Sequence, residues 1–81
     1  MKRIVFSDDA KRDIRAIPRQ RAMSILAVIH RFAESGAGDV KTLKGNEGDK
    51  RLRVGDFRVR FTETEEEIQI QAVKDRKDAY R

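Results

Sequence analysis

The segment from Arg51 to Phe61 constrains the fold more than any other part of the chain. It reads RLRVGDFRVRF, so charged and apolar residues alternate on both sides of the pair Gly55-Asp56. A period of two is typical of β-strands with one buried face, and Gly-Asp pairs occur in two-residue hairpin turns. With the turn at this pair, each residue of one strand has a single partner on the other. The segment therefore predicts an antiparallel hairpin of defined register.

This register sorts the hairpin side chains onto two faces. The face toward the core would carry Leu52, Val54, Phe57 and Val59. The opposite face would carry arginines, with Arg53 opposite Arg58 and Arg51 opposite Arg60. Like charges facing each other destabilise a sheet by ~0.2–1 kcal/mol per pair, so a small domain is not expected to keep two such pairs without an anion. A solvated sheet face is the alternative. We favour a phosphate site, because the turn residue Asp56 is the only acid in the segment.

The first half of the chain predicts one strand and two helices. Arg3 to Phe6 predicts a short strand, and Ser7 predicts the cap of a helix that runs to about Ala16. Apolar residues spaced three and four apart predict a second helix from Arg19 to Ser35, which Gly36 ends. The expected buried residues are Ala10, Ile14 and Ile17 in the first helix, and Ala22, Ile25, Leu26, Ile29, Phe32 and Ala33 in the second. The two helices would form a hairpin.

The second half predicts a loop and a three-stranded meander. The stretch 36–49 contains four of the five glycines and has no clear period, so we expect a loop there. Ile68, Ile70 and Ala72 predict the third strand of the meander. A turn at Thr64-Glu65 would place Gln69 and Gln71 on the arginine face. Residues 75–81 would form a short polar tail.

These elements predict an α+β fold. The order is β-α-α-β-β-β, with a two-helix hairpin packed on one face of a small, mainly antiparallel sheet and a short C-terminal tail. A chain of 81 residues is expected to form one domain, spanning 1–81, around a single core.

Composition narrows the function classes. The 19 Lys and Arg residues outnumber the 14 Asp and Glu residues, for a formal net charge of +5, which favours a polyanionic partner. The chain has no cysteine, and its single histidine, His30, lacks a second ligand nearby in sequence, so we expect neither metal nor cofactor. No apolar run is long enough to span a bilayer, and we expect a cytoplasmic protein without a membrane partner.

At these residues the chain resembles the RelE/ParE toxin superfamily, and its RelE-like branch in particular. The resemblance rests on the strand-first start, the patch Leu43 to Gly45, the segment Arg51 to Phe61, and the ending Val73 to Arg81, and it covers nearly the whole chain. It implies the toxin of a type II toxin–antitoxin system. Such a toxin cuts mRNA in the ribosomal A site, as an endoribonuclease that arrests translation, and is held by a cognate antitoxin protein.

The resemblance also implies roles for residues. Arg51, Arg53 and Arg58 match the basic sheet positions of RelE-like toxins, Arg76 matches an arginine after the last strand, and Tyr80 matches a tyrosine near the end of the chain. These five are the expected catalytic residues. We further expect Lys44, Lys50, Arg60, Gln69 and Gln71 to contact RNA, with Arg51 or Lys50 assisting removal of the 2′ proton.

Two other functions remain open on the sequence. A ParE-like toxin that inhibits DNA gyrase shares the fold and acts through protein contacts. A non-catalytic member of the family would bind RNA or an antitoxin and leave RNA uncut.

Overall fold

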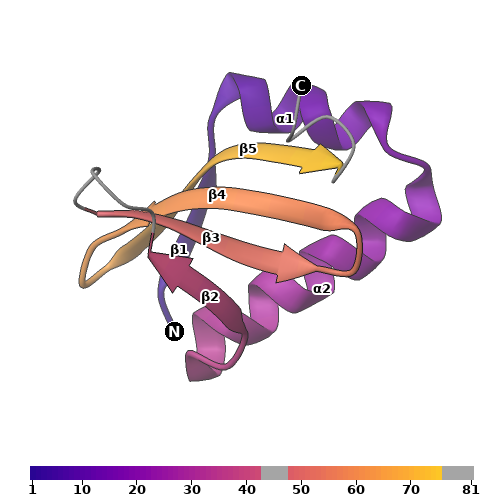
Figure 1. The fold of residues 1–81 in the computed structure, drawn as a ribbon. Coiled ribbons are helices and arrows are strands. Elements are labelled where there is room, and N and C mark those ends of the chain that lie inside the picture. The colour runs from indigo at the N-terminus through magenta and orange to yellow at the C-terminus, as the bar shows by residue number, and fades with distance from the viewer. Residues whose placement is uncertain (43–47, 76–81) are drawn as a thin grey trace.

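The computed structural model describes residues 1–42 and 48–75, in which two helices cover one face of a five-stranded sheet (Figure 1). The elements are β1 (Arg3–Phe6), α1 (Asp8–Ala16), α2 (Arg19–Ser35), β2 (Asp39–Thr42), β3 (Asp49–Val54), β4 (Phe57–Glu63) and β5 (Glu67–Asp75). The strand order is β1-β5-β4-β3-β2, with β1 parallel to β5 and all other pairs antiparallel. The predicted α+β class is confirmed.

The helix boundaries agree with the sequence signals. The Ser7 side chain caps α1 by accepting a hydrogen bond of 3.0 Å from the Ala10 amide, which satisfies one of the free amides of the first turn. Helix α2 ends at Gly36, whose φ of 75° lies in the left-handed region that glycine adopts readily. Neither helix, within residues 1–42 and 48–75, is long and apolar enough to cross a membrane.

The prediction of a loop over 36–49 is wrong for part of that stretch. Asp39–Thr42 forms β2, an edge strand paired with β3, and Asp49 already belongs to β3. The strand has one half-buried apolar residue, Val40, so its alternation is too short to stand out, and pairing with β3 is what orders it. Gly38 permits this pairing, because a Cβ at that position would lie 2.8 Å from Cδ1 of Leu52.

The core lies between the helices and the sheet. Its largest fully buried side chains are Phe61, Ile25, Ile29, Leu52, Ile68, Ile70 and Val59. The rings of Phe32 on α2 and Phe61 on β4 meet edge to face, with their centroids 5.3 Å apart. Leu26, which the helical spacing placed in the buried stripe, is 37% exposed. Ile14 and Ile17 are half-buried at the edge of the core. Ala72, which the alternation grouped with Ile68 and Ile70, lies opposite Arg60 on the sheet face away from the helices, and Val73 is buried in its place. The sequence pattern therefore identified the centre of the core and was wrong at its margins on α2 and β5.

The turn between β4 and β5 differs from the predicted pair Thr64-Glu65. It spans residues 64–66 and is closed by a hydrogen bond of 2.8 Å from the Thr64 amide to the Glu67 carbonyl. A register irregularity follows at Arg60/Phe61. Gln69 and Gln71 still join the face opposite the helices, where both hydrogen-bond the Thr62 hydroxyl.

Helix α1 protects the part of β5 that extends beyond β1. The Ser7 hydroxyl donates to the Gln71 carbonyl at 2.9 Å, and Asp13 accepts from the Val73 amide at 3.0 Å. Side chains thus satisfy backbone groups that a neighbouring strand would otherwise pair.

A carboxylate bound by two lysines joins β3 and β4 to the residue that precedes β1. Glu63 at the end of β4 accepts hydrogen bonds from Lys2 at 2.6 Å and Lys50 at 2.8 Å, and its side chain is 17% exposed. The two ammonium groups lower the pKa of the Glu63 carboxyl below its ordinary value.

Phe61→Ala is expected to lower the free energy of unfolding by about 3–5 kcal/mol, because it removes a fully buried ring and leaves a cavity against Phe32. Urea denaturation followed by circular dichroism measures the change. The exposed neighbour Arg60, changed to alanine, serves as control and should stay within about 0.5 kcal/mol of the parent. Equal losses for the two variants would contradict this account of the core.

Glu63→Gln is expected to destabilise the fold at pH 7, and the difference from the parent should shrink as the pH falls below about 4. The lowered folded-state pKa means that the ionised carboxylate stabilises the fold above the ordinary pKa of 4.5 and ceases to do so at lower pH. Urea denaturation from pH 3 to 7 tests this. Glu66→Gln in the exposed turn is the control, and a difference at Glu63 that stays constant with pH would refute the assignment.

Candidate active site

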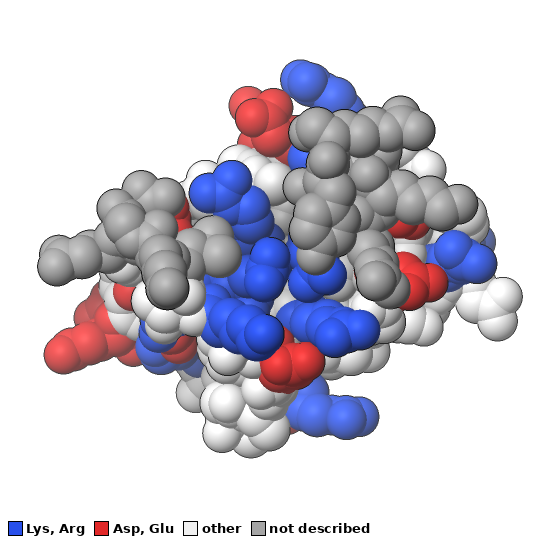
Figure 2. Space-filling model, in the orientation of Figure 1, with Lys and Arg blue, Asp and Glu red and all other residues white. Residues whose placement is uncertain are grey.

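The sheet face that turns away from the helices, here called the outer face, carries the four arginines of the hairpin. The predicted register is confirmed, with Arg51 opposite Arg60, Leu52 opposite Val59 and Arg53 opposite Arg58. Figure 2 shows Lys and Arg side chains gathered at the centre of this face, with an acidic side chain beside them. The alternation of the hairpin therefore produces a concentrated positive surface.

Strands β2 and β5 extend the arginine pairs into two rows across the sheet. The first row is Asp39, Arg53, Arg58 and Lys74, and the second is Lys41, Arg51, Arg60 and Ala72. Each row crosses the sheet along neighbouring strands, so six cationic side chains start from adjacent positions.

Four of these cations and one acid from the rows line a cavity of about 60 Å³: Lys41, Arg51, Arg53, Arg58 and Asp39. Arg51 and Arg58 are half-buried, whereas Arg53 is exposed at the rim. Guanidinium groups at such a cavity suit a phosphate group, because each can donate two parallel hydrogen bonds to its oxygens. The cavity thus unites the three sheet arginines that the sequence singled out.

The two remaining cations of the rows are held by carboxylates away from the cavity. Arg60 lies 3.7 Å from Asp49, and Lys74 reaches over the edge of β5 to Asp13 at 3.0 Å. Arg60 remains on the outer face, where it borders the cavity residues without lining it.

Asp39 and Lys41 were missed in the sequence because their segment was assigned to a loop. The signal that could have found them is the order Asp-Val-Lys-Thr, which alternates around Val40. In the structure, Asp39 lies opposite Arg53 and Lys41 opposite Arg51.

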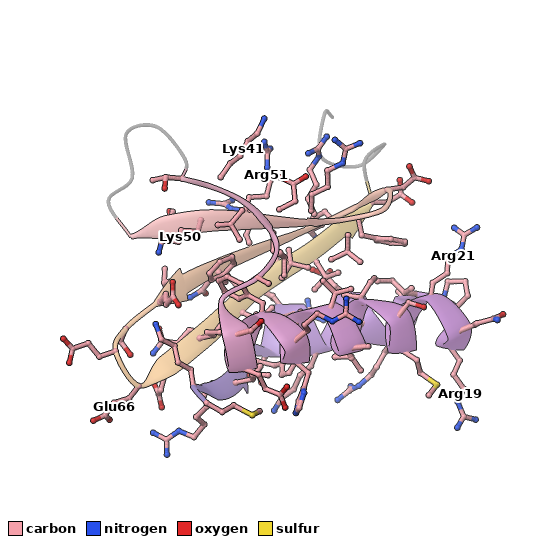
Figure 3. All side chains as sticks on the ribbon, turned by 90° about the horizontal axis from the view of Figure 1, so that it is seen from below. Arg19, Arg21, Lys41, Lys50, Arg51 and Glu66 are labelled. Atoms are coloured by element: carbon pink, nitrogen blue, oxygen red, sulfur yellow. The ribbon has the colours of Figure 1, made fainter. Side chains whose placement is uncertain are left out.

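Lys50 does not join the arginines. Figure 3 shows Lys41 and Arg51 on the side of the sheet away from the helices and Lys50 on the helix side. Lys50 pairs with the buried Phe61 in the strand register, and its ammonium group binds Glu63. The sheet therefore separates Lys50 from the cavity, which corrects its expected place in the RNA-contacting set.

The other predicted site residues fall into two groups. Gln69 and Gln71 lie on the outer face beside Thr62, one strand away from the hairpin arginines on β4. Lys44, Arg76 and Tyr80 lie outside the described residues. Among residues 1–42 and 48–75, no group of three or more His, Cys, Asp or Glu side chains could hold a metal ion.

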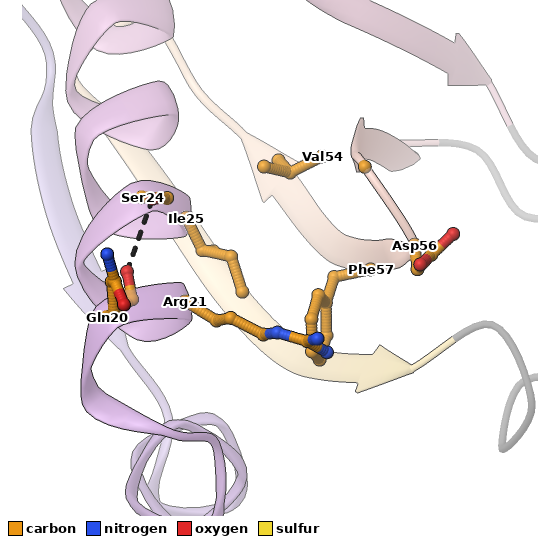
Figure 4. Close-up of a pocket in the computed structure, with 8 residues that line it drawn as sticks. Gln20, Arg21, Ser24, Ile25, Val54, Asp56 and Phe57 are labelled. Carbon is orange, nitrogen blue, oxygen red and sulfur yellow. Dashed lines mark hydrogen bonds between the residues drawn. The ribbon is translucent and has the colours of Figure 1, made fainter.

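A larger cavity of about 630 Å³ lies on the helix side, between α2 and the β3–β4 turn. Figure 4 shows Arg21 extending from α2 toward Phe57, with Gln20 and Ser24 on the adjoining turn of the helix. The Ser24 hydroxyl donates to the Gln20 carbonyl at 3.2 Å, so it is satisfied within the helix. Of the lining residues that the structure describes, Arg21 is the one cation and Asp56 the one acid, so these residues lack the charge convergence of the outer face.

The fold of this chain is similar to those of several solved structures, although its sequence matches no family model. No family model matches the sequence, and no curated protein matches it. A chain of the RelB–RelE antitoxin–toxin complex from Methanococcus jannaschii is similar in structure, with a TM-score of 0.79, 24% identity, and coverage of 94% of each chain.

Two further structures are similar. A chain of the archaeal RelE–RelB complex from Pyrococcus horikoshii has a TM-score of 0.77 and 20% identity, covering 93% of this chain and 94% of that one. The YoeB dimer from Staphylococcus aureus has a TM-score of 0.74 and 23% identity, covering 90% of this chain and 94% of that one. The chain therefore has the RelE-like fold that its sequence resembles.

Proposed function

We propose that the protein is the toxin of a type II toxin–antitoxin system, and that it cleaves mRNA in the ribosomal A site. The observation that carries the proposal is the convergence of Arg51, Arg53 and Arg58 on one cavity of the outer face. A site built from guanidinium groups has the chemistry to hold a phosphodiester, and the RelE-like fold supports the same class of activity.

In the proposed reaction, the ribose 2′-hydroxyl attacks its own 3′ phosphate. This reaction depends on in-line geometry and on stabilisation of the crowded phosphoryl oxygens. Arg53 and Arg58 would bind the phosphate, and the half-buried Arg51 would add positive charge from the neighbouring row. A requirement for the 2′-hydroxyl makes RNA the substrate and excludes DNA.

The roles expected for Arg76 and Tyr80 remain predictions. Arg76 would stabilise charge on the leaving oxygen, and Tyr80 would stack on a base or bind a ribose. Arg60 and Lys41 would attract the RNA backbone at the edge of the cavity, in contacts that weaken with salt.

A cognate antitoxin protein is the proposed partner. The similar chains from M. jannaschii and P. horikoshii were solved in complexes with RelB, which supports a partner of this kind. A protein that covers the outer face would block access of RNA to the cavity, and acidic side chains would complement the cations there.

Arg58→Ala is expected to relieve growth arrest on expression in bacteria. Loss of one phosphate contact should remove ~2–4 kcal/mol of transition-state stabilisation, which slows cleavage roughly a hundredfold or more. Arg31→Ala on the exposed surface of α2 is the matched control and should arrest growth as the parent does. Circular dichroism of the purified variants establishes that both are folded. Arrest by Arg58→Ala as strong as that of the parent would contradict the phosphate role.

Mapping mRNA 5′ ends after brief expression separates the proposed function from its alternatives. New ends within codons of translated messages are expected of a ribosome-dependent nuclease. A gyrase inhibitor would instead trigger the DNA-damage response with messages intact, and a non-catalytic RNA binder would leave both messages and DNA unchanged.

A further inference from the structure

We propose that Asp39 is the proton acceptor for the attacking 2′-hydroxyl. The inference rests on the proposed function and deepens it, because it supplies the one group that the arginine cluster lacks. A cleavage site that activates a hydroxyl gains from a positioned base, typically 10²–10⁴-fold in rate. Arginine and lysine side chains are protonated at neutral pH and serve poorly in that role.

The geometry supports Asp39 over the other carboxylates of this region. Among the residues that the structure describes, Asp39 is the only carboxylate lining the 60 Å³ cavity, and it starts directly opposite Arg53. It forms no ion pair with any residue in 1–42 or 48–75. Its oxygens are therefore available to a ligand held by the arginines.

The other carboxylates near the hairpin either form ion pairs or lie away from the 60 Å³ cavity. Asp49 lies 3.7 Å from Arg60, and Asp13 binds both Lys74 and the backbone of Val73. Asp56 occupies the turn between β3 and β4, where it lines the helix-side cavity. Asp39 differs from these three carboxylates because its position on the edge strand β2 puts it at the cavity with no ion-pair partner among the described residues.

The surrounding charges suit a base that acts next to a phosphate. Lys41, Arg51, Arg53 and Arg58 share the cavity with Asp39. These four cations offset the repulsion between the carboxylate and an incoming phosphodiester, so both anions can occupy the same small site. The row order Asp39, Arg53, Arg58 puts the base at one end and the phosphate-binding pair beside it.

Asp39 takes the proton of the 2′-hydroxyl while the 2′ oxygen forms a bond to the 3′ phosphorus. The bond from phosphorus to the 5′ oxygen of the next nucleotide breaks, and that oxygen takes a proton from water. The products are a 2′,3′-cyclic phosphate and a 5′-hydroxyl end, and Asp39 returns its proton to solvent.

Asp39→Asn tests the inference, since it removes the basic oxygen and keeps the size of the side chain. Single-turnover cleavage is measured on ribosomes programmed with an end-labelled mRNA, between pH 6.5 and 8.5. We expect the variant to cleave about a hundredfold more slowly at pH 7. Its rate should rise about tenfold per pH unit as hydroxide replaces the base, whereas the parent rate should depend much less on hydroxide, because the parent carries its own proton acceptor.

Matched variants separate proton transfer from structure and charge. Asp56→Asn removes a carboxylate from the β3–β4 turn, outside the cavity, and should cleave as the parent does. Asp39→Glu should recover part of the lost rate. Binding of a non-cleavable mRNA with a 2′-deoxy nucleotide should be as tight or tighter for Asp39→Asn, because a negative charge has been removed beside the phosphate.

The outcomes are distinguishable. A parent that leaves mRNA uncut would overturn the proposed function and this inference together. A parent that cleaves while Asp39→Asn matches or exceeds its rate would overturn only the role of Asp39. Slow cleavage by both Asp39 variants with no dependence on hydroxide would also overturn it, since that pattern indicates a role in positioning.

Discussion

Burial of the apolar side chains of the β3–β4 hairpin sets the strand register, and this register holds two pairs of arginines opposite each other. Arg53 faces Arg58 across β3 and β4, while their chain neighbours Leu52 and Val59 face each other inside the core. Burial of an aliphatic side chain contributes ~1.5–3 kcal/mol, which exceeds the ~0.2–1 kcal/mol that a like-charge pair costs. A slip of one residue would bury the arginines and expose the core, so packing on one face enforces the cation cluster on the other.

The same alternation explains what the sequence could and could not predict. The hairpin register followed from a long period-two pattern around one turn, and it located Arg51, Arg53 and Arg58 correctly relative to one another. Strand β2 escaped prediction because four residues with one apolar side chain carry little local signal, and its order comes from pairing with β3. Because β2 was missed, Asp39 and Lys41 were missed too, although they are two of the five described residues that line the cavity.

The prediction that Lys50 contacts RNA relied on its proximity in sequence to the hairpin arginines. Lys50 stands next to Arg51, yet adjacent residues of a strand point to opposite faces, and Lys50 ends in an ion pair with Glu63 on the helix side. The turn after β4 was also misplaced. The Thr64 hydroxyl accepts from the amides of Glu66 and Glu67, which makes the turn one residue longer than the predicted pair, and the register irregularity at Arg60/Phe61 has no signal in the alternation of the sequence. Face and register, more than residue type, decide which cations can act together.

The pairing of β1 with β5 has a consequence for synthesis of the protein. Arg3 lies beside Glu67, so β1 finds its sheet partner only after the helices and strands β2 to β4 that lie between them in sequence have been translated. Contacts between such distant segments form late and slow folding. A nascent chain has the arginine hairpin before it has β5, and the five-stranded sheet is complete only once β5 has been made and has paired with β1.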